Sequence, residues 1–202
     1  MLGLRNLSQS GRPTFANPKS PRTSCGGMDR PTLLVGPKTY AFAGVAAATA
    51  LFAATFALFM AAPQSPALPI VGALAHVALF PFIAAIRAPR DAKAAGYGWL
   101  VVDIVANIMA LNGADETLAS AIRLGGHVAA AIWILGVTME TRRLAFLGYP
   151  LGAMLGVYSF IAPWVPEAVF YPAFILLLAW LAGMTLLVGR FEATPRLFKA
   201  PA

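Results

Sequence analysis

Charge is scarce in this sequence. Only 11% of the 202 residues are charged and 59% are hydrophobic, and the mean hydropathy is +0.72. Soluble domains carry about 25% charged residues. A water-soluble domain of this length does not need so many apolar residues to form its core, so we expect an integral membrane protein.

Cysteine and the common catalytic motifs are also scarce or missing. The single cysteine, Cys25, excludes an intrachain disulfide. The sequence has no glycine-rich phosphate loop beside a lysine, no HExxH and no GxSxG, and no long soluble segment that could hold a catalytic domain. The sequence therefore favours a protein that is not an enzyme.

Long apolar runs are what the sequence does contain. A span of about 20 residues crosses the hydrocarbon core of about 30 Å at 1.5 Å per residue. We expect six such spans, at 39–61, 67–86, 97–111, 117–139, 144–162 and a sixth that ends near residue 189. The third is the shortest, and a re-entrant segment is the alternative there. The predicted fold class is all-α, a bundle of six transmembrane helices in one membrane domain at residues 39–190.

Polar tails flank this domain. Residues 1–38 are basic and interrupted by prolines and serines, which predicts a disordered N-terminal tail, and residues 191–202 form a short C-terminal tail. The first 28 residues contain serine and arginine but no acid, as organellar transit peptides do. A cytoplasmic tail and an extension upstream of a start at Met28 are the alternatives.

The distribution of charge predicts the orientation. All but one of the 15 Lys and Arg residues lie in the tails and in the second and fourth loops. The first, third and fifth loops contain none, and the third and fifth contain the acids Asp115, Glu116 and Glu167. By the positive-inside rule, both termini lie in the cytoplasm. The same distribution explains the net charge of +7 without nucleic acid as a partner. We expect the lipid bilayer as partner, with other membrane subunits as further candidates, and a bacterial inner membrane as location, with an organellar membrane as the alternative.

Aromatic residues near the span ends are expected to anchor the interfaces. Tyr97 and Trp99 are predicted near the inner surface, and Trp164 and Tyr171 near the outer surface.

The polar residues inside the predicted spans form the candidate ligand site: His76, Asp103, Asn107, Arg123 and His127. Polar groups facing lipid at that depth are unfavourable, so these side chains should face protein. The two histidines lie on spans that run the same way and should be near one depth. Asp103 and Asn107 are four residues apart and share a helix face.

Three functions fit this pattern. The first is a non-enzymatic assembly, regulatory or accessory subunit, in which the polar residues form interhelical hydrogen bonds. The alternative is a carrier or binding protein for a small molecule or ion, with its site between the second, third and fourth spans. The second alternative is a b-type cytochrome with haem b between His76 and His127, or a metal site that includes Asp103. The first two need no cofactor.

Arg123 is the only cation inside a span. It either extends toward Asp115, Glu116 or the headgroups, or forms the cationic end of a pocket near Tyr158.

Glycines recur at every fourth position in the fifth span: Gly148, Gly152 and Gly156. Such a stripe lets a second helix approach closely. We expect it to be a helix-packing face, with a pocket floor as the alternative.

Overall fold

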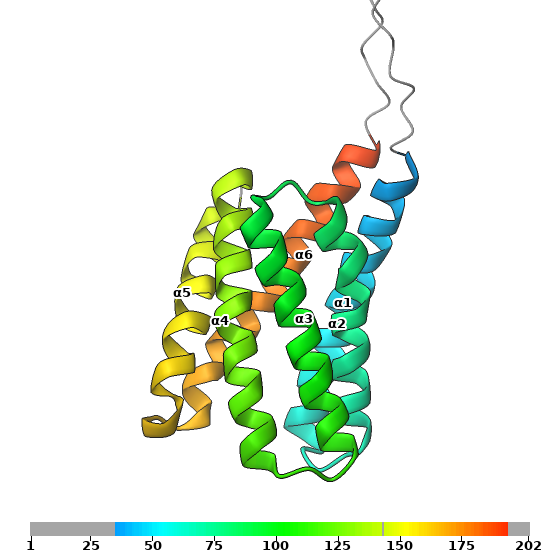
Figure 1. Cartoon of the computed structure of the whole chain (residues 1–202). Coiled ribbons are helices and arrows are strands. Elements are labelled where there is room, and N and C mark those ends of the chain that lie inside the picture. The colour runs from blue at the N-terminus through cyan, green and yellow to red at the C-terminus, as the bar shows by residue number, and fades with distance from the viewer. Residues whose placement is uncertain (1–34, 143, 194–202) are drawn as a thin grey trace, which may run out of the picture. The chain divides into compact units, whose positions relative to one another are not determined.

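The computed structural model describes residues 35–142 and 144–193, which form six long helices and two short 3-10 turns (Figure 1). The elements in chain order are α1 Val35–Ala61, α2 Ala67–Ala85, α3 Arg90–Leu111, α4 Glu116–Thr141, α5 Ala145–Ile161, η1 Ala162–Trp164, η2 Glu167–Phe170 and α6 Tyr171–Ala193. No strand occurs among the described residues. The predicted all-α six-helix bundle is confirmed.

Each of the six helical regions contains a stretch of 19 to 26 residues that is long and apolar enough to cross a bilayer. The chain is therefore a multi-pass membrane protein. Large apolar side chains are exposed along these helices, as lipid contact requires: Leu74, Val101, Ile132, Phe160, Ile175 and Leu186.

The third helix is longer than the sequence predicted. We expected a span at 97–111 preceded by a basic loop, but α3 begins at Arg90. Pro89 directly precedes this helix, and Asp91 in the first turn complements its positive end. With 22 residues α3 extends about 33 Å, enough to cross the hydrocarbon core without a re-entrant turn.

The helices also extend past both limits of the predicted membrane domain. α1 begins at Val35, inside the predicted tail, and α6 continues to Ala193. The rest of both predicted tails, residues 1–34 and 194–202, lies outside the described residues.

The six helices close a ring. Each long helix packs against the next one in the chain, and α6 returns to pack against α1. In the view of Figure 1, α3 and α4 stand in front of α6. All six helices contribute to one buried core, so side chains from distant parts of the chain meet there.

Three tryptophans dominate this core. The ring centroids of Trp99 and Trp133 are 5.4 Å apart, and those of Trp133 and Trp180 are 5.3 Å apart. The interfacial position predicted for Trp99 is wrong, because its side chain is only 3% exposed. The early start of α3 places Trp99 more than two turns inside the helix.

Candidate functional site

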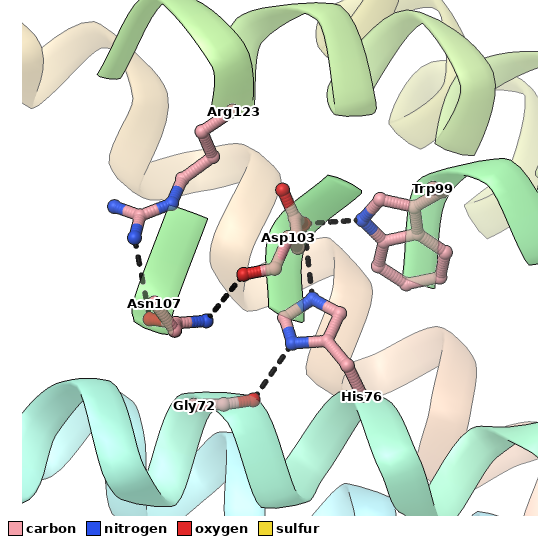
Figure 2. A network of polar contacts seen from close by, with 6 residues as sticks. All are labelled: Gly72, His76, Trp99, Asp103, Asn107 and Arg123. Atoms are coloured by element: carbon pink, nitrogen blue, oxygen red, sulfur yellow. Dashed lines mark hydrogen bonds and ion pairs between the residues drawn. The ribbon is translucent and has the colours of Figure 1, made fainter. Parts of the chain in front are cut away.

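A polar cluster lies where α2, α3 and α4 pack together. Figure 2 shows its six residues. We use "polar cluster" for these residues: Gly72 and His76 of α2, Trp99, Asp103 and Asn107 of α3, and Arg123 of α4. Four of the five residues predicted for the ligand site are in it.

An ion pair between α2 and α3 is the centre of the cluster. Nε2 of His76 lies 3.0 Å from Oδ2 of Asp103, and Nδ1 of His76 donates a hydrogen bond of 2.7 Å to the backbone oxygen of Gly72. The His76 side chain is 8% exposed and that of Asp103 is 4% exposed. Neither group has access to bulk water, so each depends on the other for electrostatic compensation.

Trp99 holds the carboxylate from the same helix. Its Nε1 donates a hydrogen bond of 2.5 Å to Oδ2 of Asp103, one turn along α3. Oδ2 therefore faces both Trp99 and His76. The other carboxylate oxygen, Oδ1, is buried and has no hydrogen-bond partner in the described part of the chain.

Gly126 of α4 makes room for that free oxygen. A Cβ atom at Gly126 would lie 2.8 Å from Oδ1 of Asp103. In Figure 2 this oxygen points away from His76, toward the side from which Arg123 comes. The carboxylate therefore bridges two interfaces, with Oδ2 toward α2 and Oδ1 toward α4.

Asn107 extends the cluster by one turn of α3. Its Nδ2 donates to the backbone oxygen of Asp103 at 2.8 Å, and its Oδ1 accepts from Nη2 of Arg123 at 3.3 Å. Its amide packs on Gly72, where a Cβ atom would lie 3.2 Å from Oδ1 of Asn107.

Arg123 is partly buried, and its hydrogen bond is with Asn107. The sequence offered Asp115 and Glu116 as its partners, and the described residues show no ion pair between Arg123 and either acid. Tyr158, the other suggested neighbour, instead packs its ring on Phe170 at a centroid distance of 4.6 Å.

His127 stands apart from the hydrogen bonds of the cluster. Its ring stacks on Phe170 of η2 with centroids 5.0 Å apart and an interplanar angle of 17°. Its Nδ1 is buried and has no hydrogen-bond partner among the described residues. His127 is nevertheless close enough to Asp103 for their charges to interact, as is Arg123.

The sequence did not single out two residues that shape this site, Trp99 and Gly126. Trp99 precedes Asp103 by four residues, a spacing that places both on one helix face. The predicted span 97–111 already contains both residues, so this spacing was available in the sequence. Nothing in the sequence around Gly126 indicated a role in the site. Only the packing of α3 against α4 shows that Gly126 faces Asp103.

Beside His76 the structure places one carboxylate, that of Asp103. No group of three or more His, Cys, Asp or Glu residues is arranged to hold a metal ion within the described residues. Both ring nitrogens of His76 already face protein oxygens. Haem between His76 and His127 would require Nε2 of His76 to leave Asp103. It stays a prediction that the visible spectrum of the purified protein tests.

The glycine stripe of α5 faces α4. A Cβ atom at Gly148 would collide with Oγ1 of Thr138, and one at Gly152 would lie 2.7 Å from Cγ of Leu135. At Gly156 the nearest atom, Cβ of Ala131, is at an ordinary 3.6 Å. The closest approach of the two helices is therefore at the first two glycines.

Comparisons with known proteins add no further assignment. No family model, no curated protein and no solved structure matches this chain.

Proposed function

We propose that this protein is a non-enzymatic membrane carrier that binds and releases a proton at the His76–Asp103 pair. The proton couples the carrier to a small solute, whose site lies between α2, α3 and α4. Ionisable residues within membrane spans mark ion and substrate pathways, including the Asp and His relays of transporters.

One observation carries this proposal: the contact between His76 and Asp103 requires one proton. The oxygen of Gly72 can only accept a hydrogen bond, so Nδ1 of His76 must carry a hydrogen. In a neutral ring, Nε2 then presents a lone pair to Oδ2, 3.0 Å away. An ionised carboxylate there would repel that lone pair. A proton on Nε2 or on the carboxyl group removes the repulsion between an ionised carboxylate and that lone pair, so the contact is a place where one proton can be held.

Arg123 lies near the pair, so the net charge of the site changes when the pair gains or loses its proton. The proton-bearing pair is neutral overall, and with it Arg123 gives the cluster a charge of +1. Loss of the proton leaves Asp103 to neutralise Arg123. A cluster that alternates between these charges attracts an anionic group in one state and releases it in the other.

We also propose that the protein spans the lipid bilayer of a bacterial inner membrane with both termini in the cytoplasm. A reporter fused after Ala202 should be cytoplasmic, and one inserted at Ala114 should be external, because the basic loops favour the inner side. An external signal from the reporter after Ala202 would contradict the proposed orientation.

An accessory or assembly subunit is the second candidate. The observation in its favour is that protein atoms already engage both nitrogens of His76 and both polar ends of the Asn107 amide. Such a closed network can fix the register of three helices without any ligand.

Infrared difference spectra of the protein in lipid nanodiscs, between about pH 5 and 8, distinguish the two candidates. For the carrier we expect a carboxylic acid band that changes with pH and is lost in Asp103→Asn. Proteoliposomes with wild-type protein should also dissipate an imposed pH gradient, and those with Asp103→Asn should not.

Asp115→Asn is the matched control. Asp115 is an exposed N-cap that accepts from the backbone nitrogen of Leu118 at 2.9 Å, and asparagine caps a helix equally well. Its variant should behave like wild type in both assays. A wild-type protein in which neither the carboxyl nor the imidazole bands change with pH would refute the carrier and favour the accessory subunit.

A further inference from the structure

Two ionisable residues on neighbouring helices, Asp103 of α3 and His127 of α4, each have an unpaired polar atom outside the His76–Asp103 contact. Oδ1 of Asp103 and Nδ1 of His127 are both buried without a hydrogen-bond partner among the described residues. Buried polar atoms in native proteins are normally paired, and the exceptions often have a functional reason. These two atoms can exchange a proton, because each can accept or carry one.

The packing of α3 on α4 brings the two residues into one region. Oδ1 of Asp103 occupies the space beside Gly126, where a Cβ atom would lie 2.8 Å away. His127 is the next residue of α4. The free carboxylate oxygen therefore lies against α4 one residue before His127.

The contacts of His127 fix its ring but leave its proton free to move. The ring stacks face to face on Phe170, which restrains its plane without using a nitrogen. The cluster contains three other charged or titratable groups near this position: His76 from α2, Asp103 from α3 and Arg123 from α4. From α1, Phe52 contributes only a ring edge-to-face with His76.

We propose that His127 is the proton-exchange partner of Asp103, so that it loads the pair on which the proposed function rests. The N–H bond at Nδ1 of a His127 imidazolium breaks, and an O–H bond forms at Oδ1 of the Asp103 carboxylate. One hydrogen-bonded water carries the proton between the two atoms. The step converts an imidazolium and a carboxylate into a neutral imidazole and a carboxylic acid, so no other reactant is needed.

Stopped-flow pH jumps on the protein in nanodiscs test this role. Trp99 donates to Asp103, so the fluorescence difference between wild type and Trp99→Phe follows the protonation of the carboxylate. His127→Phe keeps the stacking on Phe170 but removes the nitrogens. We expect it to slow the fluorescence change about tenfold or more with an unchanged final amplitude, as loss of a positioned proton-transfer group does.

Phe170→Leu is the complementary control. It removes the stacking and keeps the imidazole, so its rate should stay much closer to wild type than that of His127→Phe. If His127→Phe is as fast as wild type, or if Phe170→Leu is equally slow, His127 acts only through packing and the inference is overturned.

The glycines of α4 provide a second matched pair. Gly126→Ala places a methyl group against Oδ1 of Asp103 and should slow the exchange. In Gly125→Ala the methyl group meets nothing within 4 Å, so the rate should not change. Equal rates for the two variants would also overturn the inference.

The same data separate this inference from the proposed function. A wild-type protein whose Trp99 signal does not change with pH refutes both. A signal that Asp103→Asn abolishes, but that is insensitive to His127 and Gly126, refutes only the role of His127.

Discussion

Helix α4 packs against α3 on one side and against α5 on the other, and both interfaces depend on glycine for different reasons. On the α3 side, Gly126 admits a carboxylate oxygen of Asp103. On the α5 side, Gly148 and Gly152 admit Thr138 and Leu135 of α4. The first interface contains the charged side chains of Asp103 and Arg123, whereas the second is close helix packing around uncharged side chains. A glycine therefore either makes room for a polar side chain of the site or allows two helices to pack closely, depending on which side chain faces it.

The largest effect should come from breaking the polar interface on one side only. His76→Leu leaves the Asp103 carboxylate buried beside an apolar side chain, and removal of one partner from a buried pair typically costs about 3 to 5 kcal/mol. Unfolding of the detergent-solubilised protein by denaturant measures the loss.

The double variant His76→Leu with Asp103→Leu sharpens this result. Without either charge the interface is apolar, so the double variant should be more stable than His76→Leu alone. Additive losses would mean that the two side chains do not stabilise each other, and the α2–α3 interface would then resemble the α4–α5 interface.

An intermediate effect is expected where α5 meets α4. Gly152→Leu forces a side chain into space that Leu135 fills, and overpacking of this kind typically costs about 1 to 3 kcal/mol. Gly98→Leu is the control, because a Cβ atom there meets nothing within 4 Å. Equal thermal stability of the two variants would remove the close-packing role of the stripe.

The smallest effect belongs to the edge of the polar cluster. Arg123→Gln loses a hydrogen bond of 3.3 Å to Asn107, and interhelical hydrogen bonds in membranes average about 0.6 kcal/mol. Arg87→Gln provides the comparison, because the ion pair of Arg87 with Glu140 is 3.5 Å long and the Arg87 side chain is 93% exposed. It should not change the denaturation midpoint measurably. A larger loss from Arg87→Gln than from Arg123→Gln would contradict the assignment of Arg123 to the cluster.

The sequence alone determined the number of helices and the residues that make the polar cluster unusual. Both follow from local properties: an apolar run of about 20 residues must satisfy its backbone within a helix, and an ionisable side chain within such a run must face protein. The shared face of Asp103 and Asn107 followed from helix periodicity in the same way.

Only the tertiary structure decided which of these residues are partners. The sequence placed His76 and His127 at one depth and suggested a shared ligand, but it contains no information on the rotation of α2 and α4 about their axes. Packing turned His76 toward Asp103 and His127 toward Phe170. It also put Trp99 into the core beside Phe52 and Trp133, whereas the sequence predicted an interfacial position. Periodicity fixes which residues of one helix share a face, whereas the contacts between helices depend on how all six pack together.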